Sequence, residues 1–163
     1  MTPTLLFQEQ EEQEFDDMGS FNHSTVQGNL AYLLKRAGNY TVPIELSLDA
    51  SNIDLSQFGL KNEVVPDVCV YPKRRLIASD DILRMSEMPL LAIEVQSPRQ
   101  GGYVLTQKIK AYFAMGVQSC WLINPLNQVV HVYKNASQFT TFTAGDVIDT
   151  HLGIEVPFDE IFD

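Results

Sequence analysis

Two acidic residues stand in apolar, strand-like segments where an isolated charge would be unfavourable. Asp67 follows Pro66 within the β-rich run Val64–Tyr71, and Glu94 lies inside the nearly continuous apolar run Leu90–Val95. Burying a carboxylate costs on the order of several kcal/mol unless it is paired, protonated or bound to a cation. Because side chains repeat their face at every second residue of a strand, Asp67 and Glu94 could converge if the two runs are neighbours.

Converging carboxylates of this kind would suit Mg²⁺ or Mn²⁺. These hard cations prefer oxygen ligands, keep several waters, neutralise phosphate and activate an attacking water. Lys108, on the helix expected after the Glu94 strand, could add positive charge at a phosphate or orient the water. Other roles stay open, because Glu94 could form a structural ion pair or reach water at a strand end. Asp67 could likewise cap a turn or helix, and Lys108 could be an ordinary surface lysine.

The elements before Glu94 follow from the spacing of the apolar residues. A helical period from Val26 to Leu34 predicts a first helix that is capped within residues 22–25 and ends at residues 37–39. Tyr40–Leu48 alternates and predicts an edge strand, because Pro43 interrupts it. Three further segments complete this half of the chain: a loop over residues 49–62, a strand over Val64–Tyr71, and a connection over Pro72–Pro89 with room for one helical turn.

The second half of the chain predicts one helix and several strands. After a turn at residues 98–102, apolar spacing predicts a helix of about three turns that ends at Gly116. Strands are expected at Ser119–Ile123, Val129–Tyr133 and Gln138–Thr143, the first two joined by hairpin-like residues 124–127. A turn at residues 145–146 then leads to a short C-terminal segment. The whole order predicts an α/β sheet with helices packed on it.

Composition indicates a folded protein with an acidic surface. A chain of 163 residues suits one domain, and 45% hydrophobic residues exclude global disorder. Eleven basic residues against 21 acidic ones give a net charge of −10, which excludes a protein that coats nucleic acid through bulk positive charge. Six of the acids fall within the first 18 residues. We therefore expect residues 1–18 to form an acidic N-terminal tail and residues 19–163 to form a single domain.

The remaining sequence signals concern cysteines and the membrane. Cys69 and Cys120 lie in apolar runs without a Cys/His cluster, so we expect small core residues rather than zinc ligands. No stretch approaches the ~18 apolar residues of a membrane span, and the start of the chain lacks the charge pattern of a secretory signal. We expect a cytoplasmic protein with no membrane partner.

Taken in order, the motifs resemble the Uma-type proteins, restriction-endonuclease-like domains that are abundant in cyanobacteria and were formerly a domain of unknown function. The resemblance covers roughly residues 18–163. It is carried by Pro66-Asp67, by the segment Leu91–Pro98, by Lys108 with Tyr112, and by Ser119–Pro125. It implies a place in the PD-(D/E)XK nuclease superfamily and a restriction-endonuclease-like mixed β-sheet flanked by α-helices.

The resemblance also implies a set of site residues. Asp67 and Glu94 would bind Mg²⁺ or Mn²⁺, with the main-chain carbonyl of Gln96 as a third ligand. The superfamily's lysine normally lies two residues after the acid, where this sequence has Gln96, so Lys108 on the following helix is expected to take its catalytic role. Relatives often carry an acid four residues before this lysine, but the residue here is Val104. No first-helix carboxylate is evident either.

The implied activity is metal-dependent hydrolysis of DNA phosphodiester bonds. His23 would either cap the first helix or approach the metal. Candidate phosphate contacts are Lys73, Arg74, Arg75 and Arg99, although three consecutive basic residues in a loop can equally form a solvated turn. The net charge predicts weak, salt-dependent DNA affinity, and two copies presenting two sites would make a homodimer plausible. The alternative is a nuclease-fold protein that has lost turnover and serves in binding or regulation.

Overall fold

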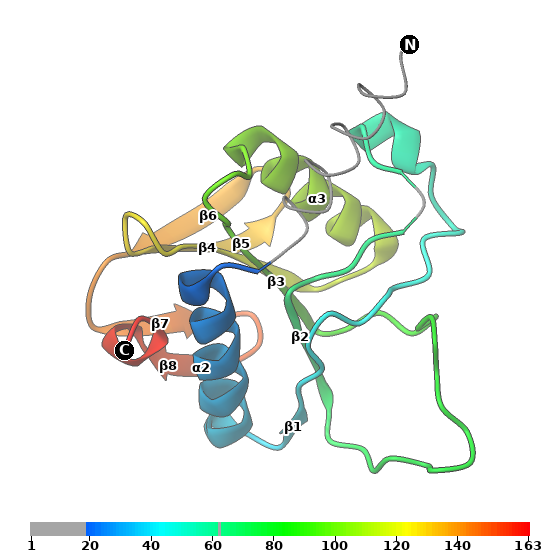
Figure 1. Cartoon of the computed structure of the whole chain (residues 1–163), viewed down its shortest axis with the longest axis horizontal. Coiled ribbons are helices and arrows are strands. Elements are labelled where there is room, and N and C mark those ends of the chain that lie inside the picture. Colours follow the sequence, from blue (N-terminus) through cyan, green and yellow to red (C-terminus); the bar gives the residue numbers. More distant parts are fainter. Residues whose placement is uncertain (1–18, 62) are drawn as a thin grey trace, which may run out of the picture.

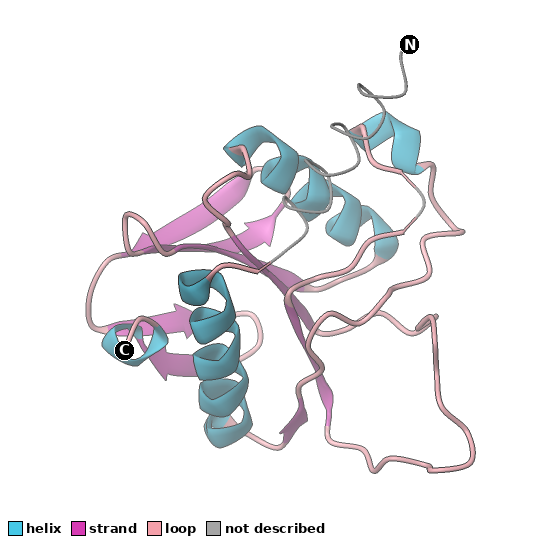
Figure 2. Ribbon diagram, viewed as in Figure 1, coloured by secondary structure: helices cyan, strands magenta, loops and turns pink. Residues whose placement is uncertain are grey.

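A mixed six-stranded sheet with helices on both faces forms the centre of the computed structural model (Figures 1 and 2). The structure describes residues 19–61 and 63–163, so the predicted acidic tail lies outside the described residues. The helices are α2 (Phe21–Ala37), the 3₁₀ helix η1 (Leu55–Phe58), α3 (Gly102–Met115) and α4 (Phe158–Ile161). This arrangement confirms the predicted fold class.

The strands cross the sheet in the order in which they occur in the chain. They are β1 (Tyr40–Thr41), β2 (Val68–Pro72), β3 (Leu91–Val95), β4 (Ser119–Asn124), β5 (Val129–Asn135) and β6 (Gln138–Phe142). Only β3 and β4 pair in parallel, while the other neighbours are antiparallel. A parallel pair needs a crossover connection, and α3 provides it. A separate hairpin consists of β7 (Asp146–Asp149) and β8 (Ile154–Pro157).

Two hydrophobic cores lie on opposite faces of this sheet. Ile93 and Val95 of β3 belong to the core that includes residues of α2 and α4, whereas Ala92 belongs to the core that includes residues of α3. Glu94 follows the same alternation as Ala92, so its side chain is directed toward α3. Every residue of β3 is buried, as the continuous apolar run predicted.

The strands before Glu94 are shorter than predicted. Only two residues form β1, although its predicted place at the sheet edge is confirmed. Glu45, inside the predicted strand, has a φ of 55°, which a regular strand does not adopt. β2 starts at Val68 rather than at Val64, because Val64 forms only an isolated bridge with Leu48.

Four further predictions about local structure are corrected. Residues 73–90 contain no helical turn, whereas the predicted loop over residues 49–62 contains η1. The short C-terminal segment is in fact the β7–β8 hairpin followed by α4. Ser20 caps α2 by accepting a hydrogen bond from the His23 main-chain N–H, so the helix begins one turn earlier than the predicted cap residues imply.

The second helix and the cysteines agree with the sequence. α3 ends at Gly116, which has a φ of 107° and donates its N–H to the carbonyls of Phe113 and Tyr112. Cys69 and Cys120 are free and buried. Within residues 19–61 and 63–163, the helices are all too short or too polar to cross a lipid bilayer.

Candidate active site

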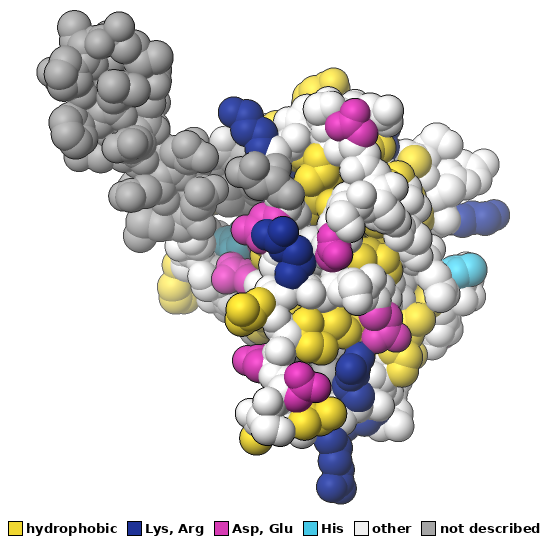
Figure 3. Space-filling model, turned by 90° about the vertical axis from the view of Figure 1, so that its right-hand side faces the viewer, with side chains coloured by type: hydrophobic (Ala, Val, Ile, Leu, Met, Phe, Trp, Pro, Cys, Tyr) yellow, Lys and Arg dark blue, Asp and Glu magenta, His cyan; other side chains and the backbone are white. Residues whose placement is uncertain are grey.

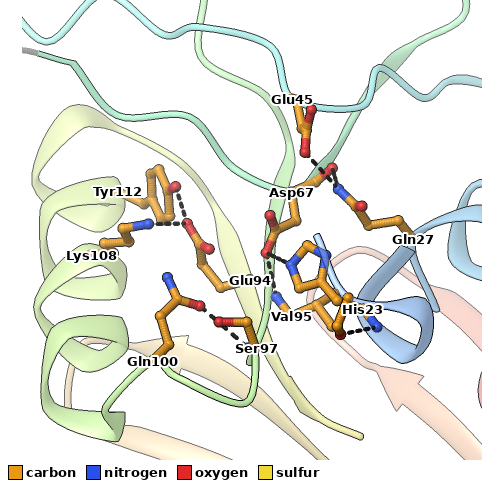
Figure 4. Close-up of polar contacts among 11 residues, drawn as sticks. His23, Gln27, Glu45, Asp67, Glu94, Val95, Ser97, Gln100, Lys108 and Tyr112 are labelled. Atoms are coloured by element: carbon orange, nitrogen blue, oxygen red, sulfur yellow. Dashed lines mark hydrogen bonds and ion pairs between the residues drawn. The ribbon is translucent and has the colours of Figure 1, made fainter. Parts of the chain in front are cut away.

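Strand pairing brings Asp67 and Glu94 to adjoining positions. β2 and β3 are antiparallel with Val68 opposite Ile93, so the next pair along the ladder is Asp67 and Glu94. Asp67 directly precedes β2, and Glu94 is the penultimate residue of β3. The two acids, 27 residues apart in the sequence, therefore meet at one end of this strand pair (Figure 4).

The Asp67 carboxylate is fixed by contacts from β3 and α2. Its Oδ2 accepts a hydrogen bond from the Val95 main-chain N–H at 2.7 Å and lies 3.2 Å from His23 Nε2. The hydrogen bond to Asp67 is the main cause of a raised His23 pKa, opposed by the burial of the ring. Of the two predicted roles of His23, capping the helix is wrong, because the imidazole faces Asp67 and Ser20 provides the cap.

The Glu94 carboxylate is almost fully buried, with 1% of the residue exposed. The Tyr112 hydroxyl donates to Glu94 Oε1 at 2.5 Å, and Lys108 Nζ lies 3.7 Å from the same oxygen. Burial raises the Glu94 pKa to about 8, with a further contribution from Asp67, while Lys108 and Tyr112 oppose the shift. Glu94 therefore does not reach water at a strand end.

Lys108 approaches Glu94 from the helix that follows the strand. Lys108 and Tyr112 are four residues apart, so they share one face of α3 and reach Glu94 together. The Lys108 side chain is only 23% exposed. Lys108 is therefore not an ordinary surface lysine. Its contact with Glu94 agrees both with a structural ion pair and with a catalytic amine placed next to the acid.

The chemistry of these side chains fits a divalent cation that keeps part of its water shell. The described portion of the chain contains no group of three or more His, Cys, Asp or Glu residues arranged to hold a metal ion. Mg²⁺ commonly uses one or two carboxylates and completes its shell with water and phosphate oxygens. A cation between Asp67 and Glu94 would also offset their repulsion and the burial of Glu94.

Gln96 follows β3, beside the two acids. Its main-chain N–H donates to the Ile123 carbonyl, and its side-chain amide donates to the Gln100 carbonyl at 3.1 Å. The amide is therefore held by the loop that leads to α3. Because an amide carries no charge, it cannot supply the positive charge of a lysine at this position.

Gln27 and Glu45 are polar residues near the site that the sequence did not reveal. The buried Gln27 side chain donates to the Asp67 main-chain carbonyl at 3.2 Å and to Glu45 Oε1 at 3.4 Å. Glu45 also donates its own main-chain N–H to that carbonyl. Glu45 thus supplies a carboxylate near Asp67, although α2 has none there. Nothing in the sequence indicated this role for Glu45, because the alternating run around it predicted an ordinary strand.

The predicted DNA-contacting residues lie in two different places. Lys73, Arg74 and Arg75 are exposed after the opposite end of β2, about 20 Å from Asp67 at the usual rise per strand residue. Arg74 forms an ion pair with Glu87 at 2.8 Å. Arg99 is exposed in the loop between β3 and α3, five residues after Glu94. Arg99 thus follows the end of β3 that carries Glu94, whereas the three loop residues follow the other end of β2.

The Uma2 family, described as "Putative restriction endonuclease", matches residues 12–157 of the sequence. Among solved structures, a similar chain is described as "a putative nuclease belonging to DUF820 from Anabaena variabilis ATCC 29413". The two chains share 21% identity with a TM-score of 0.70, over 90% of this chain and 83% of the other. At this identity, the likeness shows the fold alone. A comparison with curated proteins found no significant match. Since the family match spans well over half of the sequence, the chain belongs to the Uma2 family.

Proposed function

We propose that the protein is a metal-dependent endonuclease that hydrolyses phosphodiester bonds of DNA. One observation carries this proposal: the buried Glu94 meets Asp67 at the end of neighbouring strands, and Lys108 lies next to Glu94. The restriction-endonuclease description of the family supports the reaction class. A carboxylate pair beside an amine is a suitable arrangement for a divalent ion and a phosphate.

Asp67 and Glu94 would hold Mg²⁺ or Mn²⁺, with the Gln96 carbonyl as the proposed third ligand. When bound, the ion would neutralise phosphate charge and acidify an attacking water. His23 and Val95 contact Asp67 at Oδ2, and Tyr112 and Lys108 contact Glu94 at Oε1. These contacts would hold the two carboxylates in place for the ion.

Lys108 would act on the phosphate rather than on the metal. Its ammonium group is held beside Glu94 by the 3.7 Å ion pair, which also limits its freedom. A fixed positive charge stabilises the negative charge that builds at phosphorus in the transition state. Lys108 therefore takes the part that a strand lysine has elsewhere in the superfamily.

DNA binding is expected to be weak and sensitive to salt. On the face drawn in Figure 3, basic side chains lie among acidic and hydrophobic ones and form no continuous basic surface in the described residues. The number of phosphates that such a surface neutralises is small, which limits affinity at physiological salt. A homodimer would present two sites to a duplex and so partly compensate. The buried thiols of Cys69 and Cys120 are compatible with the proposed cytoplasmic location.

Plasmid nicking tests the proposal directly. Supercoiled DNA at low salt with Mg²⁺ or Mn²⁺ should be nicked by the wild-type protein and by the control Glu155→Gln, an exposed acid on β8. Asp67→Asn and Glu94→Gln should both abolish nicking. Cleavage that persists in the two site variants would identify a contaminating nuclease instead.

The second candidate is a binding or regulatory protein that keeps the nuclease fold without turnover. The amide of Gln96 at the usual lysine position and the partly exposed Val104 in place of an acid favour this candidate. It predicts that Mn²⁺ raises the melting temperature of the wild type but not of Asp67→Asn, while no metal supports nicking.

A further inference from the structure

A pocket of about 190 Å³ lies beside the carboxylate site. It is enclosed by the start of α2, by the segment that follows β3, and by the turn between β4 and β5. The lining residues are Ser20, Asn22, His23, Gln96, Ser97, Pro98, Asn124, Pro125 and Leu126. His23 joins the two regions, because one edge of its ring faces Asp67 and the residue also lines the pocket.

Two buried polar atoms of lining residues have no hydrogen-bond partner among the described residues. They are His23 Nδ1 and Ser97 Oγ, on residues that are 7% and 9% exposed. Leaving a buried polar atom unpaired costs about 1–3 kcal/mol, so such atoms usually meet a ligand or water. With Nε2 facing Asp67, His23 Nδ1 can accept a hydrogen bond when the ring is neutral and donate one when it is protonated, while the Ser97 hydroxyl can donate or accept. The pocket thus offers both kinds of hydrogen bond.

The rest of the pocket selects against a charged occupant. None of the described lining residues is Lys, Arg, Asp or Glu, and Pro98, Pro125 and Leu126 supply apolar walls. A phosphate would find no lysine or arginine side chain there among the described lining residues. The volume is below the roughly 300–1,000 Å³ of sites for drug-sized ligands, which suits an occupant no larger than a small ring system.

We infer that this pocket receives an unpaired nucleobase, so the substrate is nucleic acid with a single-stranded or extruded nucleotide next to the cleaved bond. The inference rests on the proposed function, because the adjacent carboxylates would bind the phosphate of the same strand. A base stacked in a duplex cannot reach the buried polar atoms of His23 and Ser97, and enzymes that read an extruded base use hydrogen bonds together with apolar contacts.

The test uses short single-stranded oligonucleotides that carry 2-aminopurine at one position, at low salt with Ca²⁺ in place of Mg²⁺. One position should change its fluorescence when the wild type binds. Ser97→Ala should weaken binding about threefold to tenfold, the range for one lost hydrogen bond. Its melting temperature should stay the same or rise, because the hydroxyl has no partner in the described structure. A purely structural serine would show the reverse.

Ser119→Ala is the matched control. Ser119 is also buried, but its hydroxyl donates to Asp149 at 3.3 Å, so this variant should melt earlier and bind the oligonucleotide as the wild type does. Binding without a fluorescence change at any position, or equal binding of an oligonucleotide with an abasic site, would overturn the inference and leave plasmid nicking intact. Absence of both oligonucleotide binding and plasmid nicking would remove the proposed function as well.

Discussion

Lys108 Nζ on α3 lies 3.7 Å from Glu94 Oε1 on β3, so the positive charge reaches the acid from the next helix rather than from the same strand. Two residues after Glu94, the Gln96 amide is instead bonded to the Gln100 carbonyl. The contact also explains why burial of Glu94 is tolerable, because an ammonium group and the Tyr112 hydroxyl both stabilise its charged form.

Replacing Lys108 should slow catalysis without removing the metal site. Lys108→Met should lower the single-turnover nicking rate roughly 100- to 1,000-fold at saturating Mn²⁺, the usual loss for one group that stabilises transition-state charge. Lys110→Met, an exposed lysine on the same helix, is the control and should nick normally. Equal loss in both variants would mean that general surface charge, not the contact with Glu94, matters.

Stability without metal should fall as pH rises. The Glu94 pKa is raised from 4.5 to about 8, so between these values the folded state binds a proton that the unfolded state has released. The contribution of Glu94 to the free energy of unfolding is fully present below pH 4.5 and is lost as the pH rises through 8. The loss is on the order of a few kcal/mol. The raised His23 pKa acts in the same direction.

Thermal unfolding in EDTA from pH 5 to pH 9 measures this effect. The wild-type melting temperature should decline across the range, and Glu94→Gln should flatten the decline and melt higher than the wild type at pH 8. A wild-type melting temperature that increases between pH 6 and pH 8 would show that Glu94 is ionised throughout.

Removing the Tyr112 hydroxyl should destabilise the protein. Tyr112 is fully buried and donates to Glu94, so Tyr112→Phe loses that bond and leaves the carboxyl with less stabilisation. We expect a loss of about 1–3 kcal/mol in the free energy of unfolding, measured by urea titration. Tyr103→Phe, on the same helix but 76% exposed, should unfold like the wild type.

The β7–β8 hairpin is held to the sheet by a buried acid. Asp149 accepts hydrogen bonds from Trp121 Nε1 at 2.9 Å and from the Ser119 hydroxyl at 3.3 Å. Asp149→Ala leaves those donors unpaired and should cost about 2–3 kcal/mol. Urea unfolding followed by the fluorescence of Trp121, the chain's one tryptophan, measures it. Asp146→Ala, at the exposed start of β7, should change little, and an equal effect would argue against the network.

Local patterns in the sequence were sufficient for much of the framework. Helical spacing located α2 and α3, and the continuous apolar run located β3 as a strand covered on both faces. The same run marked Glu94, because an acid among apolar residues needs a partner wherever the strand is buried. These features depend on neighbouring residues, which is why sequence alone reveals them.

Contacts between distant segments had to come from the tertiary structure. Asp67 meets Glu94 only because β2 and β3 pair in this register, and His23 reaches Asp67 because α2 packs beside that end of the sheet. The positive φ of Glu45 and the pocket with its two unpartnered atoms have no signature in residue spacing. The spacing of apolar side chains predicts which face of a helix or strand is apolar. Which other element that face packs against depends on the fold of the whole chain.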